Sequence, residues 1–277
     1  MEADRQNGCI GVFDSGLGGL TVVRRLMAEL PGEDIVYLGD CARVPYGTKS
    51  PETIRAFARQ DADFLMKFDP KLIVVACNTA SAHALDALSA ALPVSVIGMV
   101  EPGARLAVTF AGPGPIGVIA TEATISSQAY PRMLERLQPG CKVLSAACPL
   151  LVPIVEEGRG EDDPIVLAVL SDYLRQMQRE RPTTLILGCT HYPLLSGAIG
   201  KLMGPATRLI DSGWAAALAV KRQLTQSHLA RAAGGGGTLK CFATDNPQRL
   251  SLLAQRIMGR AVEVNWVGTD ELTCEKV

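Results

Sequence analysis

The sequence predicts an α/β fold made of two pseudosymmetric α/β domains with parallel sheets. Short aliphatic runs alternate with helix-length amphipathic stretches, a pattern typical of parallel sheets that helices cover on both faces. Equivalent landmarks recur in the same order about 110 positions apart, which indicates a duplicated unit rather than a solenoid. The chain has 277 residues, a length that suits two modest domains.

Nine short apolar runs are the expected strands, and helices are expected between them. Ser50 is a suitable N-cap and Pro51 suits the first helical position, so a helix is predicted over Pro51–Phe68. A second helix-like run covers Trp214–Leu224, and a further strand and helix follow it. The expected strands are Cys9–Phe13, Ile35–Leu38, Leu72–Ala76, Ser95–Gly98, Ile116–Ala120, Val143–Ala146, Thr184–Leu187, Arg208–Ile210 and Leu239–Ala243.

Four pairs of landmarks support the duplication. The segments that begin at Ile10 and Ile116 share the letters IGV, and similar motifs surround the other three pairs. Four pairs in the same order favour two similar domains over a chance match. The other pairs are Cys41 with Cys148, Cys77 with Cys189, and Ile97 with Ile210.

The duplication also predicts the domain boundaries. The first unit is expected to cover residues 1–98 and the second unit residues 99–211. Residues 212–277 include a flexible glycine spacer at Gly234–Gly237 and are too few for a comfortable independent domain. We therefore expect this tail to pack on the first unit, so that residues 1–98 and 212–277 form one discontinuous domain.

The charge balance and hydropathy exclude several classes of function. Lys plus Arg is 27 and Asp plus Glu is 28, and this balance favours neither nucleic acid nor a charged membrane surface as a partner. The longest aliphatic run, Ile165–Leu170, is far shorter than the roughly 20 residues of a membrane-spanning helix. The N-terminal segment is polar and does not resemble a secretory signal, so we expect a cytoplasmic protein.

The eight cysteines do not form a recognised metal or redox motif. No two of them stand in a C-x-x-C relation, which removes the usual cue for zinc ribbons and thioredoxin-like sites. We expect no metal site. Four cysteines are expected to be structural, namely Cys9, Cys141, Cys241 and Cys274.

Two cysteines occupy equivalent places in the two units. Cys77 and Cys189 each follow an apolar run directly, at the end of a parallel strand where ligands gather. A helix is expected to begin beside each of them, with Pro193 marking the second start, and a helix N-terminus favours a thiolate. A buried structural role is the alternative, but the equivalent positions favour a functional pair that faces across a cleft.

Asp14 ends the first strand and opens a glycine-rich turn at residues 15–19. It is interpreted either as a helix N-cap or as a functional residue. The turn differs from the G-x-G-x-x-G pattern of nucleotide folds, because Thr21 occupies the last glycine position. Its backbone N–H groups are suited to binding a carboxylate.

His191 and two glutamates are further candidates for proton transfer. His191 lies two residues after Cys189 and is a natural proton partner for that thiol. Glu156 and Glu157 follow Cys148, and the residues alone do not choose between them. A metal site at Cys189 and His191 is disfavoured, because no second ligand cluster stands at a suitable spacing.

The sequence contains no recognisable site for a cofactor. It has no lysine in a pyridoxal-type setting, and no flavin, nicotinamide or P-loop fingerprint. We therefore expect an enzyme without a cofactor that uses two thiols. Proton removal from one face of a carbon acid and return to the opposite face suits such a duplicated scaffold.

Five motifs together resemble the glutamate racemases, cofactor-independent enzymes of bacterial cell-wall synthesis. They are FDSGLGGL, GDCARVPYG, ACNTAS, CPLLVPIVEEG and LGCTHYPLL, and they span Phe13 to Leu195. The resemblance implies an active site in the cleft between the two domains. It also implies interconversion of L- and D-glutamate, with D-glutamate destined for peptidoglycan, and it is compatible with a homodimer.

The same resemblance assigns roles to individual residues. Cys77 and Cys189 would be the two acid/base thiols, acting on D- and L-glutamate respectively. Asp14 would assist Cys77, while His191 and Glu156 would assist Cys189. The implied substrate contacts are Asp14, Ser15, Tyr46, Gly47, Asn78, Thr79, Thr121, Thr124, Thr190 and His191.

Two alternative functions are weighed against the resemblance, and one residue differs from the family's pattern. An aspartate or hydantoin racemase shares the two-thiol logic, although the GCTHYPLL and VPYG motifs favour glutamate. A binding or regulatory protein on a racemase scaffold is the other alternative, and retention of both thiols disfavours it. Some relatives modulate DNA gyrase, but the net charge gives no independent support for that role here. Cys41 stands where the family more often has a small hydroxyl residue, close to the loop that bears Arg43, Pro45 and Tyr46.

Overall fold

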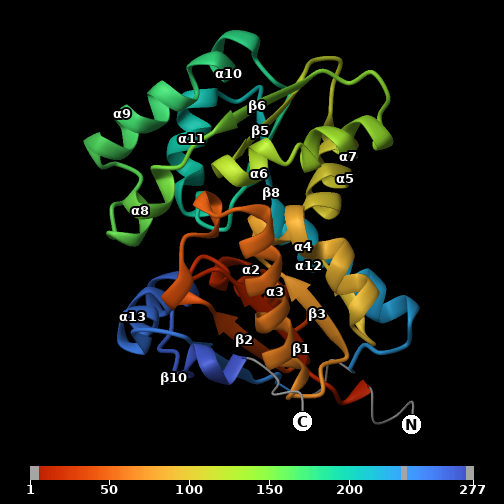
Figure 1. The fold of residues 1–277 in the computed structure, drawn as a ribbon. Coiled ribbons are helices and arrows are strands. Elements are labelled where there is room, and N and C mark those ends of the chain that lie inside the picture. The colour runs from red at the N-terminus through yellow and green to blue at the C-terminus, as the bar shows by residue number, and fades with distance from the viewer. Residues whose placement is uncertain (1–5, 232–235, 273–277) are drawn as a thin grey trace.

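Two parallel sheets form the framework of the protein. The computed structural model describes residues 6–231 and 236–272, so Cys274, Gly234 and Gly235 lie outside the described residues. Figure 1 shows the four-stranded sheet above the six-stranded sheet. The strands are β1 (Ile10–Asp14), β2 (Ile35–Gly39), β3 (Leu72–Val75), β4 (Ser95–Ile97), β5 (Ile116–Ala120), β6 (Val143–Ala147), β7 (Thr184–Gly188), β8 (Arg208–Asp211), β9 (Leu239–Ala243) and β10 (Val264–Trp266).

The two sheets share one topology. The larger sheet has the order β10-β9-β2-β1-β3-β4 and the smaller sheet the order β6-β5-β7-β8. The run β2-β1-β3-β4 therefore corresponds strand by strand to the smaller sheet, and neighbouring described strands pair in parallel. The predicted fold class, with two parallel sheets, is confirmed.

The C-terminal segment adds two strands to the larger sheet. Strand β9 pairs with β2, and β10 pairs with β9 at the edge. The expected bounds of β9 agree with the structure, but β10 was not predicted, because three residues at a sheet edge carry little hydrophobic pattern. The domain boundaries at residues 98 and 211 stay a prediction.

Helices cover both faces of each sheet, as Figure 1 shows. On the larger sheet one core cluster packs against α2, α12 and α13, and the opposite cluster packs against α3 and α4. On the smaller sheet the two clusters pack against α8–α11 and against α5 and α7. The helices are α2 (Leu20–Glu29), α3 (Pro51–Met66), α4 (Asn78–Ala91), α5 (Val100–Phe110), α6 (Glu122–Ser126), α7 (Ala129–Leu137), α8 (Leu151–Glu156), α9 (Pro164–Tyr173), α10 (Arg175–Glu180), α11 (Ser196–Met203), α12 (Ser212–Gln226) and α13 (Pro247–Met258).

Helix α3 shows how closely the local sequence sets an element. Ser50 Oγ accepts a hydrogen bond from the N–H of Thr53 at 3.3 Å, and Pro51 is the first helical residue. Ile54, Ala58 and Leu65 are fully buried on one face. The helix ends at Met66, two residues before the predicted end. Among residues 6–231 and 236–272, none of the helices has the length and apolar character needed to cross a membrane.

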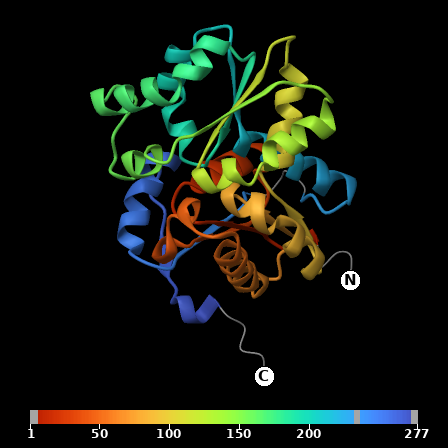
Figure 2. The same cartoon turned by 45° about the horizontal axis from the view of Figure 1, so that its top comes forward.

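The carboxyl ends of both sheets lie where the two domains meet. In Figure 2 the yellow-green helix α6, which follows β5, lies beside α4, which follows β3, and the two helices are in contact. The strand ends that bear the two candidate thiols are therefore brought to one junction.

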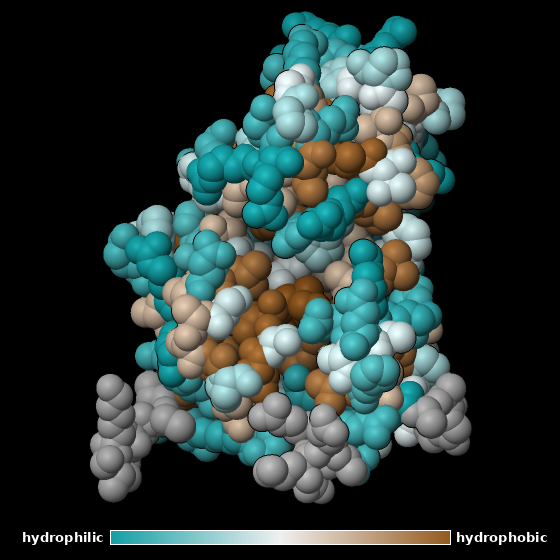
Figure 3. Space-filling model, turned by 90° about the vertical axis from the view of Figure 1, so that its right-hand side faces the viewer, coloured by the Kyte–Doolittle hydropathy of each residue, from teal (hydrophilic) through white to brown (hydrophobic). Residues whose placement is uncertain are grey.

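The space-filling view in Figure 3 shows the right-hand side of Figure 1. This face is hollowed, and hydrophobic residues gather on it inside a hydrophilic margin.

Candidate active site

A small cavity lies at the junction of the two sheets, and both candidate thiols line it. Cys77 follows β3 and Cys189 follows β7, which are equivalent strands. The cavity holds about 20 Å³ of free space, room for about one water molecule. Asp14, Thr124 and Glu156 lie behind its walls and contact lining residues. The lining residues are Ser15, Val44, Pro45, Tyr46, Gly47, Cys77, Asn78, Thr79, Thr121, Val152, Gly188, Cys189, Thr190 and His191.

Cys77 is the N-cap of α4 and is a buried thiol. Its Sγ accepts a hydrogen bond from the N–H of Ala80 at 3.4 Å, and its S–H donates to Ser15 Oγ at 3.6 Å. Burial and the charge of Asp14 nevertheless raise the pKa of Cys77 to about 12. The N–H donor at the helix N-terminus lowers the pKa of Cys77, as expected, but desolvation in this closed cavity outweighs it, so the thiol stays protonated at neutral pH.

Cys189 contacts His191, its expected proton partner, and His191 in turn contacts Glu156, the glutamate that the resemblance selected. The Sγ of Cys189 is 3.7 Å from Nδ1 of His191, and Nε2 of His191 is 3.1 Å from Oε1 of Glu156. Burial alone would lower the pKa of His191, but the contacts with Cys189 and Glu156 raise it to about 10. The imidazole of His191 is therefore protonated at neutral pH, between the Cys189 sulfur and the Glu156 side chain.

The segment after Cys189 differs from its counterpart after Cys77. A 3₁₀ turn, η3 (Tyr192–Leu195), comes first, and α11 begins only at Ser196. Pro193 does mark the start of a helix, but that helix is the 3₁₀ turn, and the α-helix begins three residues later. The positive charge near the Cys189 sulfur comes from His191 instead of from a helix N-terminus.

Protein stability is expected to fall with rising pH because of His191. Its pKa is raised from 6.5 to about 10, so the folded state keeps a proton that the unfolded state releases. The contribution is complete below pH 6.5 and is lost as pH rises through about 10, at about 1.4 kcal/mol per pH unit. Urea unfolding of the wild type and of His191→Gln across this pH range measures it. A stability difference that is independent of pH contradicts the prediction.

Asp14 joins the turn after β1 to the other sheet. Its Oδ2 accepts the N–H groups of Gly16 at 3.2 Å and Gly19 at 3.0 Å, and its Oδ1 accepts the hydroxyl of Thr190 at 3.5 Å. The side chain is fully buried, and burial raises its pKa. Helix α2 has Gly19 as its N-cap without a side-chain hydrogen bond, so the N-cap interpretation of Asp14 is wrong.

Hydroxyl and amide groups cover the rest of the cavity. The hydroxyls of Thr79, Thr121 and Thr124 contact one another at 2.8, 2.9 and 3.1 Å. This triad links α4 to the segment after β5. The amide of Asn78 is held at both ends, because Nδ2 donates to Ser212 Oγ at 3.2 Å and Oδ1 accepts the Tyr130 hydroxyl at 2.7 Å.

Tyr46 and Gly47 form the wall that faces Thr121. The Tyr46 hydroxyl contacts Asp40 and lies 2.8 Å from Oδ2 of Asp61, so it points away from the cavity. Gly47 has no Cβ, and a Cβ there would lie 2.8 Å from Cβ of Thr121. A glycine is therefore required for the two walls to approach this closely.

Several residues near the cavity were missed by sequence reasoning. Ser212 could have been found, because it directly follows β8, at the same sheet edge as the cysteines. Asp40 directly follows β2 and had the same signal. Tyr130 and Asp61 lie on helices and become neighbours of the site only through tertiary packing.

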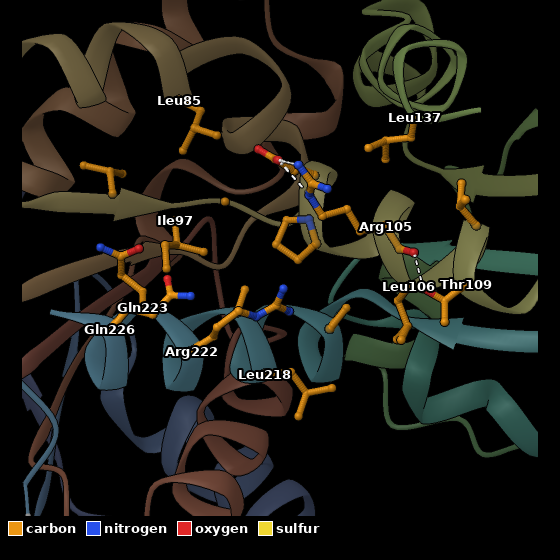
Figure 4. Close-up of a pocket in the computed structure, with 17 residues that line it drawn as sticks. Leu85, Ile97, Arg105, Leu106, Thr109, Leu137, Leu218, Arg222, Gln223 and Gln226 are labelled. Atoms are coloured by element: carbon orange, nitrogen blue, oxygen red, sulfur yellow. Dashed lines mark hydrogen bonds and ion pairs between the residues drawn. The ribbon is translucent and has the colours of Figure 1, made fainter. Parts of the chain in front are cut away.

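A larger groove lies elsewhere between the domains and contains none of the expected site residues. It has a volume of about 560 Å³ and is lined from α4, β4, α5, α7 and α12, as Figure 4 shows. Arg105 in this groove is paired with Glu101 at 2.7 Å. Thiols and a histidine line the small cavity instead, which makes that cavity the candidate active site. Within the described ranges, no group of three or more His, Cys, Asp or Glu side chains is placed to hold a metal ion.

Two related sheets that place a pair of cysteines in one cavity are the arrangement of an α/β enzyme with two thiols in its active site. Comparisons with known proteins show to which family of such enzymes the chain belongs. The profile of the family described as Asp/Glu/Hydantoin racemase matches residues 10–220. The glutamate racemase of Geobacter metallireducens is 45% identical over 90% of this chain and 92% of its own length. The chain belongs to the Asp/Glu/hydantoin racemase family, and it is an amino-acid racemase.

Solved structures support the same assignment. Glutamate racemase isoform RacE1 from Bacillus anthracis has a TM-score of 0.91 at 40% identity, covering 94% of this chain and 97% of that chain. The glutamate racemase of Francisella tularensis, solved in complex with D-glutamate, has a TM-score of 0.88 at 38% identity, covering 96% of this chain and 99% of that chain. An aspartate racemase from Picrophilus torridus has a TM-score of 0.56 at 17% identity, covering 80% of this chain and 99% of that chain, and shares the fold only.

Proposed function

We propose that this racemase interconverts L- and D-glutamate without a cofactor, using Cys77 and Cys189 as the two acid/base groups. The observation that carries the proposal is the placement of both thiols in one cavity from the ends of equivalent strands. The charge of Cys189 also contributes to the raised pKa of Cys77, which is consistent with two thiols close together. The relatives named glutamate racemase support glutamate as the substrate.

Inversion at Cα requires one group to remove the proton and a second group to return one from the opposite face. With L-glutamate bound, the Cys189 thiolate takes the α-proton and becomes a thiol. The electron pair left at Cα then takes the proton of Cys77, which becomes a thiolate. The reverse direction uses the two thiols in exchanged roles.

The proton held by Cys77 suits the L-to-D direction. The raised pKa of Cys77 keeps it a proton donor at neutral pH. Cys189 is the removing group, and the positive charge of His191 stabilises its thiolate, with Glu156 balancing that charge from the other side. Asp14 acts on Cys77 indirectly, because its buried negative charge raises the pKa of that thiol and so helps to keep the proton on it. After D-glutamate has formed, Cys189 is a thiol and Cys77 is a thiolate. The proton must return to Cys77 and leave Cys189 before L-glutamate can react again.

The polar groups of the cavity are proposed to hold the substrate. Glutamate carries two carboxylates and an ammonium group, and the walls offer hydroxyls, amides and backbone N–H groups for them. The proposed contacts include the Thr79, Thr121 and Thr124 hydroxyls and the Asn78 amide. The cavity is too small for glutamate as it stands, so binding requires the walls at Gly47 and Thr121 to separate. The remaining proposed contacts are Asp14, Ser15, Gly47, Thr190, His191 and Tyr46, the last through atoms other than its hydroxyl, which Asp40 and Asp61 hold.

The product would be D-glutamate for peptidoglycan synthesis, made in the cytoplasm. The relatives' glutamate racemase names support this role, because D-glutamate is a component of the bacterial cell wall.

A racemase assay with glutamate and aspartate tests the proposed substrate. We expect at least a tenfold preference in kcat/KM for glutamate, because the shorter aspartate leaves buried donors unpaired at about 1–3 kcal/mol each, and about 1.4 kcal/mol equals a factor of ten. The protein is first dialysed exhaustively against a chelator. Equal turnover of aspartate contradicts glutamate specificity. Activity that returns only with pyridoxal phosphate or a metal ion contradicts the cofactor-free mechanism.

A further inference from the structure

Behind the Tyr46 wall of the cavity, two buried carboxyl groups share one tyrosine hydroxyl. Asp40 follows β2 and Asp61 lies in the middle of α3, and both side chains are fully buried. Arg43 belongs to the 3₁₀ turn η1 (Cys41–Arg43), and Tyr46 begins the 3₁₀ turn η2 (Tyr46–Thr48). The cluster therefore connects the loop that carries Tyr46 to a strand end and a helix of the larger sheet.

The hydrogen bonds of this cluster require an additional proton. The Tyr46 hydroxyl contacts Oδ2 of Asp40 and lies 2.8 Å from Oδ2 of Asp61. A tyrosine hydroxyl has one hydrogen and can donate to only one of these oxygens. With both carboxyls ionised, the second contact would place two oxygens together without a hydrogen between them. One of the two carboxyl groups must therefore be protonated.

The surrounding donors indicate that Asp61 carries this proton. Asp40 accepts from Arg43 Nε at 2.7 Å and from the Thr244 hydroxyl at 3.0 Å, in addition to Tyr46, as an ionised carboxylate does. Asp61 accepts from Arg43 at 2.9 Å on Oδ1, which leaves Oδ2 free to donate to Tyr46. Burial and the charge of Asp40 also raise the pKa of Asp61 well above its ordinary value.

We propose that Asp61 is a positioning residue, held as a neutral acid that donates to the Tyr46 hydroxyl and so fixes the Tyr46–Gly47 wall of the active site. The proton chain runs from Asp61 through Tyr46 to Asp40, and Arg43 bridges the two carboxyl groups. Gly47 meets Thr121 too closely for a Cβ between them, so a small shift of this wall changes the cavity. The proposal rests on the proposed function insofar as this wall holds the substrate.

Paired substitutions test the neutral state of Asp61. The side-chain amide introduced by Asp61→Asn can donate to Tyr46 and accept from Arg43 as the neutral acid does, so kcat and KM should stay near the wild-type values. Asp61→Ala removes both bonds, and kcat should fall by about 10–10²-fold, because small misplacements of reacting groups have large effects on rate. Asp40→Asn is the matched control for Asp61→Asn. We expect its kcat to fall about as far as that of Asp61→Ala, because the substitution removes the charge that balances Arg43.

Two outcomes of the kinetic test would overturn the proposal. If Asp61→Asn loses as much activity as Asp61→Ala, then Asp61 is ionised. If Asp61→Ala lowers the melting temperature while kcat and KM of the folded protein stay unchanged, then Asp61 is structural only. Should Asp61→Ala fail to fold, Tyr46→Phe cuts the same chain of bonds, and an unchanged kcat in that variant is equally contradictory.

A second readout needs no substrate, so its result is independent of the proposed function. The groups around Asp61 are Arg43, Tyr46, Asp40 and, farther away, Asp14. Above the ordinary aspartate pKa of about 3.9, folded wild type keeps a proton on Asp61 that the unfolded chain releases. Relative to Asp61→Asn, the folding equilibrium constant of the wild type should therefore fall about tenfold per pH unit up to the pKa in the folded protein. A pH-independent ratio overturns the neutral acid.

Discussion

Replacing either Cys77 or Cys189 by alanine is expected to reduce racemisation by about 10²–10⁴-fold or more, in both directions. Each thiol is the only group proposed to move a proton on its face of Cα, and both line one cavity. The two enantiomers have equal free energies, so kcat/KM must fall by the same factor from L- and from D-glutamate. Polarimetry with each enantiomer measures this loss.

Other cysteines provide controls for these variants. Cys141 is half-buried in the loop after α7, away from the cavity, and Cys141→Ala should retain wild-type activity. Cys241 is fully buried in β9, so Cys241→Ala should lose stability but keep its kcat. Far-UV circular dichroism shows whether each variant is folded. Substantial racemisation by Cys77→Ala or Cys189→Ala would rule out the two-thiol mechanism.

Replacing His191 by asparagine is expected to lower kcat/KM by about 10²-fold. The variant loses the positive charge 3.7 Å from the Cys189 sulfur and leaves the Glu156 carboxylate without its partner at 3.1 Å. Both effects disfavour a thiolate at Cys189. Initial rates from each enantiomer over a range of pH measure the loss.

His228 provides the matched control for His191. It is exposed and has a φ of 57°, a left-handed conformation that asparagine adopts readily. His228→Asn should therefore keep the wild-type kcat/KM and pH profile. A His191→Asn variant as active as His228→Asn would remove His191 from the mechanism.

The fold was predictable because its signals are local and repeated. Buried parallel strands are continuous apolar runs, so Ile116–Ala120 was bounded correctly. The bounds of Leu239–Ala243 were also correct, although Lys240 interrupts that run and is exposed. The duplication then placed Cys77 and Cys189 at equivalent strand ends. Strand β10 escaped prediction, because an exposed edge strand of three residues is not constrained by burial.

The electrostatics of the site could not be predicted from local sequence. The helix N-terminus at Cys77 suggested a thiolate, but complete burial and Asp14, 63 positions earlier in the chain, dominate its pKa. Motif resemblance marked Tyr46 as a substrate contact, but its hydroxyl is held by Asp40 and Asp61. Asp61 lies within an amphipathic helix, where a polar residue ordinarily indicates a solvated face. The contacts of Cys77 with Asp14 and of Tyr46 with Asp61 arise from tertiary packing, which the local sequence does not show.

Solvent deuterium labelling tests the two-thiol mechanism most directly. The racemase is incubated in deuterated water with L- or D-glutamate, and label at Cα is measured at low conversion in both the product and the recovered substrate. Removal by one thiol and return from the other predicts deuterium in the product and little in the substrate, from either enantiomer. Extensive label in the recovered substrate before product forms would contradict this account, because it indicates a single base that exchanges its proton with solvent.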